Sequence, residues 1–440
     1  MSKKSFIKGT FILTFAGVLT RILGFFFKIY MSRIIGAKGM GLFQLVMPVC
    51  AVCYAIGISG FEVAVSRLTA VHTSKGRNGS AYGIAILCQA FSLIISVICC
   101  IFIRINADII AKYFFHNADC APLIRIIILS LPFSCIHCIV SGYYLGQEKT
   151  GFPAFSQLAE QIIRIASVYI IVKITGRADA SMGVLSLVTG EAGAAVISIS
   201  SIIFAKRKAG KIVFSKNGIK EHTKEIFHTA LPVSSNRTAL HGLQSIEASL
   251  IPYMLIKSGL TSVEALSLYG IVTGMAMPII LFPATLSNSV SLMLLPSVSK
   301  IKNNTEKLKE SGMNALWFSL VFGFVCIIFF ETLGASIGAY CFKEEEVKTY
   351  IRILAWLCPF MFLSSTYKSI LNALGKSSLV FANNMLSEAV CLICIVVLIP
   401  KLGIRAYLIG LLVNKAINSL LQMRSYFSYL KVQFTRDYTG

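Results

Sequence analysis

Long apolar runs separated by short polar segments extend along the whole chain. A helix that crosses about 30 Å of hydrocarbon needs about 20 residues. By that measure the sequence predicts twelve membrane-spanning helices, at 9–31, 41–66, 80–104, 121–145, 153–174, 181–205, 228–256, 264–298, 312–341, 348–373, 379–400 and 404–430. The pattern therefore indicates an all-α integral membrane protein, with an uncleaved first helix.

Composition and charge agree with a membrane protein. Hydrophobic residues make up 56% of the 440 residues, charged residues only 14%, and the mean hydropathy is +0.76. The net charge is +22, but the basic residues cluster in short segments between apolar runs, which is typical of cytoplasmic loops and not of nucleic-acid binding. Counting Lys and Arg in alternate connections predicts that both termini are cytoplasmic.

The two halves of the chain resemble each other at an offset near 228 residues. LPFSCIHCIVSGYYLGQ (131–147) is similar to CPFMFLSSTYKSILNALGK (358–376), and QLAEQIIRI (157–165) to MLSEAVCLI (385–393). Each half would hold six helices, so the sequence predicts two lobes related by a parallel repeat. We expect an N-terminal lobe at 1–205, a basic cytoplasmic linker at 206–227 and a C-terminal lobe at 228–440.

Thirteen cysteines lie mostly within the apolar runs, and three pairs have C-x-x-C spacing. On a membrane helix, cysteine at i and i+3 is usually a small packing residue. The sequence therefore predicts neither a disulfide framework nor a cysteine metal site.

Ionisable residues within the apolar runs are the candidates for function, because a charge at the bilayer centre costs roughly 2.5–3.5 kcal/mol on insertion scales. They are Arg21, Lys28, Glu62, Arg67, Glu160, Arg164 and Glu191 in the first half and Arg237, Glu247, Glu331, Lys368, Glu388 and Lys415 in the second.

Arg21 and Arg237 differ from the rest. Each lies in the first helix of its half, and neither has an acidic residue three or four positions away. Guanidinium groups match phosphate oxygens bidentately, so two of them facing a central cavity from opposite lobes would suit a pyrophosphate, with Lys28 as a further contact. The alternative is that each arginine caps backbone carbonyls at a helix break.

The acidic residues allow other roles. Glu160 and Arg164 are four residues apart, so they can pair on one helix face, either structurally or within the cavity. Glu62 and Glu247 are candidates for ion coupling. The chain has no Walker A sequence, no Asp-rich metal–pyrophosphate motif and no Ser-His-Asp pattern, so we expect no enzyme, no cofactor and no metal.

Two segments of the first half are distinctive, FIKGTFILTFAGVLTRILGFFFKIYMSRIIGAKGMGLFQ (6–44) and SGYYLGQEKTGFPAFSQLAEQIIRIA (141–166). They closely resemble the stage V sporulation protein B family of the multidrug/oligosaccharidyl-lipid/polysaccharide exporter superfamily. The resemblance implies two six-helix lobes around a cavity that opens alternately to each side of the bacterial cytoplasmic membrane. The implied substrate is a polyprenyl-pyrophosphate-linked saccharide for the spore cortex or cell wall. The implied partners are membrane lipids and cell-wall synthesis enzymes.

The chain also departs from its relatives. Glu62 stands where a proline is expected, and Phe27, with Lys28 beside it, stands where lipid II flippases carry a second arginine. Two other functions stay open. One is a cation-coupled multidrug exporter of the same fold, which would need acidic residues in its cavity. The other is a membrane scaffold for envelope enzymes that transports nothing.

Overall fold

The computed structural model describes residues 3–209, 216–284 and 304–439, and every regular element within those ranges is a helix. Eight of the described helices are long and apolar enough to cross a membrane, or nine if one bent pair counts as a span. The prediction of an all-α, multi-pass membrane protein is therefore confirmed. Two further predicted spans, 153–174 and 228–256, correspond to α7 (Gly151–Thr175) and α9 (Lys216–Lys257).

The first two predicted spans are joined without a loop. Helix α1 (Lys3–Tyr54) continues through the single π turn η1 (Ala55–Ser59) into α2 (Gly60–Ser74). The break between the spans is a kink at Gly36, whose φ of 68° lies in the left-handed region that glycine adopts at little cost. A glycine thus redirects the chain where the sequence suggested a loop.

The residues form two compact units. Unit 1 contains Met1–Ile35 and Leu42–Ser249, and unit 2 contains Gly36–Gly41 and Leu250–Gly440. This structural division lies inside α9. The lobe and linker boundaries drawn from the sequence, at 1–205, 206–227 and 228–440, stay a prediction.

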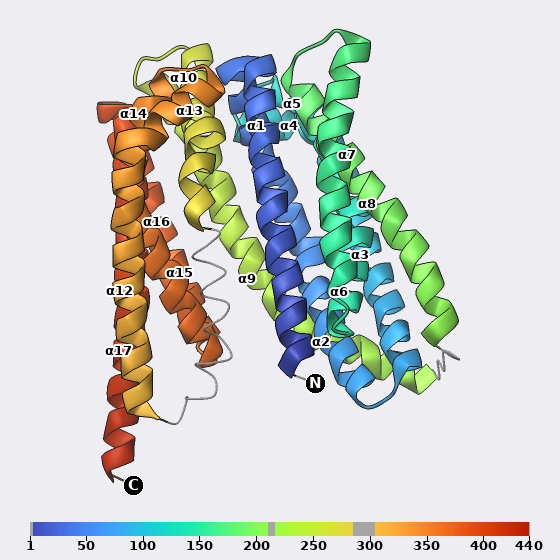
Figure 1. Cartoon of the computed structure of the whole chain (residues 1–440). Coiled ribbons are helices and arrows are strands. Elements are labelled where there is room, and N and C mark those ends of the chain that lie inside the picture. The colour runs from blue at the N-terminus through green and yellow to red at the C-terminus, as the bar shows by residue number, and fades with distance from the viewer. Residues whose placement is uncertain (1–2, 210–215, 285–303, 440) are drawn as a thin grey trace. The chain divides into compact units, whose positions relative to one another are not determined.

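Unit 1 is a bundle of long helices. In it α6 and α7 pack on α8, and α2 and α3 pack on α6 (Figure 1). Its core is apolar and includes Phe61, Tyr82, Leu131 and Tyr143. Its remaining elements are α3 (Asn78–Ile105), α4 (Ala107–Ile109), η2 (Ile110–Phe114), α5 (Cys120–Ile127), α6 (Ser130–Gly146) and α8 (Ala180–Ala209).

Unit 2 is built in a similar way. Helices α16 and α17 lie side by side, α15 packs on α17, and α12 packs on α15 (Figure 1). Tyr367 and Tyr426 fill its core, and the Tyr367 hydroxyl donates to the carbonyl of Gly312 at 3.0 Å. Its elements are α10 (Ser262–Tyr269), η3 (Gly270–Ala276), α12 (Thr305–Phe329), η4 (Phe330–Gly334), α13 (Ala335–Phe342), α14 (Glu346–Ala355), α15 (Cys358–Ala373), α16 (Ser377–Leu402) and α17 (Ile404–Thr439).

All thirteen cysteines are free thiols. Most are buried among apolar side chains, and Cys135 donates to the hydroxyl of Ser92 at 3.1 Å. Their behaviour as packing residues, without disulfides, agrees with the interpretation of the sequence.

Candidate functional site

The interior of unit 1 contains a cluster of ionisable side chains from three neighbouring helices. Nδ1 of His137 on α6 lies 3.7 Å from Oε2 of Glu160 on α7 and 3.6 Å from Oε2 of Glu191 on α8. All three side chains are at most 20% exposed. Two carboxylates so close together repel each other, so the cluster attracts a proton or a cation.

Arg164 provides part of the balancing charge. Its guanidinium forms an ion pair with Glu160, one helical turn earlier, and donates to Oε1 of Gln161 at 3.0 Å. The two charged side chains are 17% and 13% exposed, which places the pair well inside the bundle. This ion pair neutralises the carboxylate of Glu160. His137 is then the group that can compensate the charge of Glu191.

Glu62 lies on α2 beside this cluster. Its Oε2 accepts a 3.0 Å hydrogen bond from the hydroxyl of Tyr54, whose oxygen also lies 3.3 Å from the sulfur of Cys138. Arg237 on α9 and His137 are both close enough to Glu62 to act on its charge. The sequence-predicted residues Glu62 and Arg237 are thus brought into one electrostatic environment within unit 1.

Arg21 and Lys28 lie on one face of α1, because residues 21, 24 and 28 are spaced by three and four. Between them, Gly24 lies next to α7: a Cβ built on Gly24 would be 3.6 Å from Nε2 of Gln161. Arg21 is exposed and Lys28 is half-buried. Neither forms a hydrogen bond or ion pair with another residue in the described ranges.

Arg237 is also exposed, and it lies in the part of α9 that belongs to unit 1. All three arginine and lysine candidates for phosphate binding therefore belong to the same compact unit. Glu247 is half-buried and has an interaction of its own. It lies about 15 Å along α9 from Arg237, at 1.5 Å per residue, so the helix does not place the two side by side.

Part of this cluster was not predicted from the sequence. Glu191 was one of the ionisable residues within the apolar runs but had no predicted partner, and His137 was not among the candidates. The available signal was the same one that selected Arg21, a polar side chain within an apolar run. The spacing of residues along one helix does not show which other helices pack around that side chain. Its partners therefore could not be predicted from the sequence.

Among the residues that the structure describes, two groups of side chains have the composition and spacing of metal ligands. One is His137, Glu160 and Glu191, and the other is His72, His222 and Glu225; in each group the ligand atoms lie within 4.8 Å of one another. In the first group the carboxylate of Glu160 already forms an ion pair with Arg164.

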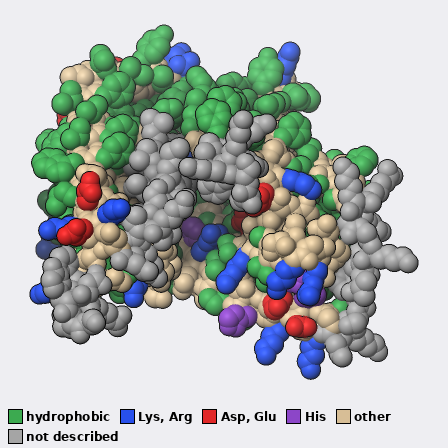
Figure 2. Space-filling model, turned by 60° about the horizontal axis from the view of Figure 1, so that its bottom comes forward, with side chains coloured by type: hydrophobic (Ala, Val, Ile, Leu, Met, Phe, Trp, Pro, Cys, Tyr) green, Lys and Arg blue, Asp and Glu red, His purple; other side chains and the backbone are tan. Residues whose placement is uncertain are grey.

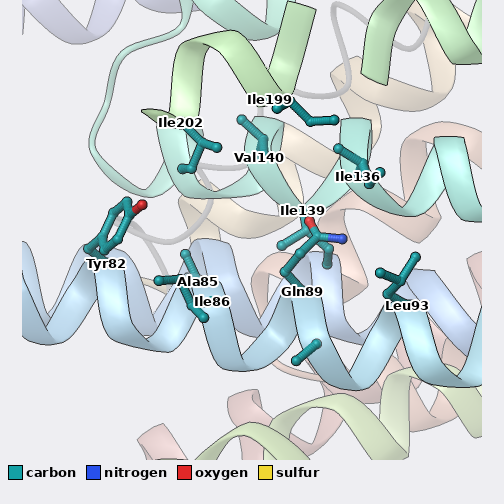
Figure 3. A pocket seen from close by; sticks show the side chains of 11 residues that line it. Tyr82, Ala85, Ile86, Gln89, Leu93, Ile136, Ile139, Val140, Ile199 and Ile202 are labelled. Carbon is teal, nitrogen blue, oxygen red and sulfur yellow. The ribbon is translucent and has the colours of Figure 1, made fainter. Parts of the chain in front are cut away.

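Unit 1 also contains cavities lined by apolar side chains. One, of about 350 Å³, lies among α3, α6 and α8, where Gln89 reaches toward Ile139 (Figure 3). Gln89 donates to the sulfur of Cys135 at 3.2 Å. A second groove, of about 500 Å³, lies between α1 and α7 and is lined by Leu23, Phe26 and Tyr169 among others. Both have the chemistry of hydrocarbon-binding surfaces.

Comparison with known families and proteins gives consistent results. The sequence model described as Polysaccharide biosynthesis protein matches residues 6–302, and the model described as MatE matches 248–398. The chain is 24% identical over 434 residues to the stage V sporulation protein B of Bacillus subtilis, a match that covers 96% of this chain and 83% of that protein. It is 23% identical over 428 residues to the lipid II flippase MurJ of the same organism, covering 91% and 78%.

Solved structures show the same fold. An inward-facing multidrug resistance MATE family transporter of the MOP superfamily superposes with a TM-score of 0.72 at 14% identity, over 94% of this chain and 96% of that one. A MOP superfamily transporter from Pyrococcus furiosus superposes with a TM-score of 0.66 at 15% identity, over 98% and 96%. The MATE-like fold predicted from the sequence is confirmed.

Proposed function

Because this chain belongs to the polysaccharide biosynthesis protein family, we propose that it is a membrane flippase for a polyprenyl-pyrophosphate-linked saccharide. The observation that carries the proposal is the state of Arg21. This arginine lies in the middle of an apolar helix, exposed, and without an ion pair to any residue of the described ranges. A charge in that position is costly unless a ligand or water compensates it.

A pyrophosphate headgroup is the compensating ligand that the chemistry favours. Arg21 and Lys28 present two positive charges on one face of α1, and Arg237 presents a third from α9. Burying a pyrophosphate in hydrocarbon without partners is prohibitive, whereas fixed guanidinium and ammonium groups replace the water that it loses. We assign these three side chains to phosphate binding.

The lipid tail has a place along α1, on the side of the helix away from the cations. The groove lined by Leu23, Phe26 and Tyr169 is apolar, and with about 3.6 residues per turn Leu23 and Phe26 lie across the helix from Arg21. A polyprenyl chain held there would stay in contact with lipid while its headgroup meets the cations. This arrangement supports a lipid-linked substrate over a free sugar.

The transport cycle follows from these assignments. The headgroup enters from the cytoplasmic leaflet of the bacterial cytoplasmic membrane, binds Arg21, Lys28 and Arg237, and is released outside after an alternating-access change. Both termini lie in the cytoplasm. Glu62 or Glu247 couples the cycle to an ion gradient, and the saccharide serves spore-cortex or cell-wall synthesis, in contact with the enzymes that consume it.

The test is precursor flipping in proteoliposomes, with a fluorescent polyprenyl-pyrophosphate saccharide and a membrane-impermeant quencher. Arg21→Ala and Arg237→Ala should abolish flipping, and Arg21→Lys should retain part of it because the charge remains. The control is Arg177→Ala, an exposed arginine between α7 and α8. Flipping that is absent in the wild type, or unchanged in both alanine variants, would contradict the proposal and favour a non-transporting scaffold.

One observation favours a second function on the same fold. The cluster of Glu62, Glu160 and Glu191 around His137 could bind a coupling cation or a cationic drug. A cation-coupled multidrug exporter would therefore extrude a cationic dye from loaded vesicles, and Glu191→Gln would stop it. Dye export that is unaffected by Arg21→Ala would distinguish this function from lipid flipping.

A further inference from the structure

Two histidines and a glutamate meet at one end of unit 1, away from the residues assigned to the substrate. His72 lies in the last turn of α2, and His222 and Glu225 lie near the start of α9. Oε2 of Glu225 is 3.5 Å from Nδ1 of His222 and 3.9 Å from Nε2 of His72. The two imidazole rings meet edge to face, with centroids 5.2 Å apart.

The contact between α2 and α9 explains why these residues meet. Gly60 lies against Ala230, and His72 faces His222. Between these contacts the rings of Phe61 and Phe227 pack with their centroids 5.7 Å apart. Residue numbers rise along α2 as they fall along α9, so the two helices run antiparallel. The histidine–glutamate group lies at the far end of that pair.

Three atoms of the group are buried and have no hydrogen-bond partner within the described part of the chain. They are Nδ1 of His72, Nδ1 of His222 and Oε2 of Glu225, and the last two approach each other at 3.5 Å. Buried polar atoms are normally satisfied, so an unsatisfied pair at one point indicates that a ligand belongs there.

The spacing of the three atoms fits a small metal ion. In a tetrahedral zinc site with bonds of about 2.1 Å, ligand atoms are roughly 3.4 Å apart. Oε2 of Glu225 is 3.5 and 3.9 Å from the two imidazole nitrogens, and all three atoms lie within 4.8 Å of one another. Small side-chain rotations would close the remaining difference.

The geometry points to a Zn²⁺ site formed by His72, His222 and Glu225, with water as the fourth ligand. Imidazole donors select zinc and its neighbours over magnesium and calcium. The metal would fasten the end of α2 to the start of α9, two segments about 150 residues apart in sequence, and so act as a clamp on unit 1.

The electrostatic surroundings agree with a site of modest net charge. Lys75 and Arg77 act on His72, and Glu225 is the only acidic side chain that does so among the described residues. Figure 2 shows the same end of the unit, where Lys, Arg and His side chains gather with a few acidic ones. A calcium site would need several carboxylates around the metal, so these surroundings also favour a metal bound by histidine.

The test is direct metal binding to the full-length protein in detergent after treatment with EDTA. Zn²⁺ is titrated against a competing chromophoric chelator, and Co²⁺ is used as a spectroscopic substitute. The wild type should bind one Zn²⁺ per chain and give the visible absorption of tetrahedral Co²⁺. His72→Ala and His222→Ala should each weaken zinc binding by roughly 100-fold or more. Mutating a residue that only hydrogen-bonds to a metal ligand already costs up to about 100-fold in affinity, and losing a ligand should cost at least as much.

Glu225→Gln serves as the mildest variant, because it keeps the size of the side chain and removes the charged ligand; it should also weaken binding. His228→Ala, an exposed histidine on the same helix, is the matched control and should bind like the wild type. The proposal is overturned if the wild type binds no zinc, if His228→Ala loses binding equally, or if Glu191→Gln abolishes it while His72→Ala does not. The last result would place the metal at His137.

Discussion

Nδ1 of His137 lies 3.6 Å from Oε2 of Glu191 and 3.7 Å from Oε2 of Glu160, so one imidazole on α6 is shared by carboxylates from α7 and α8. Arg164 forms an ion pair with the other carboxylate oxygen of Glu160, Oε1. The four side chains join three helices through charge in the interior of unit 1. Their balance makes the cluster sensitive to the loss of any one member.

Removing Arg164 should destabilise the protein strongly. Arg164→Ala leaves Glu160 close to Glu191 without its cation, and breaking a buried pair from one side costs about 3 kcal/mol. Arg164→Ala/Glu160→Gln should recover most of that loss, because the uncompensated charge is gone. Both tryptophans, Trp317 and Trp356, lie in unit 2, so stability is best measured by heating followed by size-exclusion chromatography. A double variant as unstable as Arg164→Ala would show that the pair is not the cause.

Replacing a glycine by alanine should change the stability of the protein very differently at a helix contact and at an open position. A Cβ on Gly60 would lie 2.3 Å from the carbonyl oxygen of Ala230 and 2.4 Å from Oγ of Ser234, whereas a Cβ on Gly17 meets nothing within 4 Å. Gly60→Ala should therefore cost about 1–3 kcal/mol by forcing α2 from α9. Gly17→Ala should be neutral or stabilise α1 by up to about 1 kcal/mol. Equal melting temperatures for the two variants would contradict the close packing of α2 on α9.

Local spacing explains which parts of this site the sequence could predict. Glu160 and Arg164 are four residues apart on one helix, and they do form an ion pair. The link from Glu160 to His137 and Glu191 runs between helices, and its partners are set by packing that no single apolar run contains. A charged residue within an apolar run can be recognised alone, but its partner cannot.

The same limit applies to the backbone. The apolar runs at 9–31 and 41–66 were recognisable by length, yet no loop separates them: the chain is helical on both sides of Gly36, whose own backbone angles are not helical. A polar stretch between two spans resembles a loop in sequence. Whether it forms one depends on what α1 packs against, and Gly41 there has room for no side chain beside Leu266.

A second buried carboxylate, in unit 2, gives an independent prediction. Oε2 of Glu388 accepts a 2.9 Å hydrogen bond from the amide of Asn414, and Asn414 is 1% exposed. Asn414→Asp keeps the shape but replaces the donor with a second carboxylate, so it should lower the free energy of unfolding by about 2 kcal/mol or more. Glu388→Gln combined with Asn414→Asp should be more stable than Asn414→Asp alone. Stability is again measured by heating followed by size-exclusion chromatography. An Asn414→Asp variant as stable as the wild type would exclude repulsion between the two carboxylates.

The hydroxyl of Tyr54 should matter for both stability and transport. Tyr54→Phe removes the 3.0 Å hydrogen bond to Glu62, which costs about 2 kcal/mol for a bond to a charged acceptor. If Glu62 couples transport to an ion gradient, Glu62→Gln should flip the lipid-linked substrate at a rate that no longer responds to an imposed Na⁺ or proton gradient. Tyr54→Phe keeps the carboxylate, so its flipping should still respond, with a changed dependence on the ion concentration. The comparison is made in proteoliposomes with and without each gradient. A Glu62→Gln variant that still responds like the wild type would remove Glu62 from the coupling mechanism and leave Glu247 as the candidate.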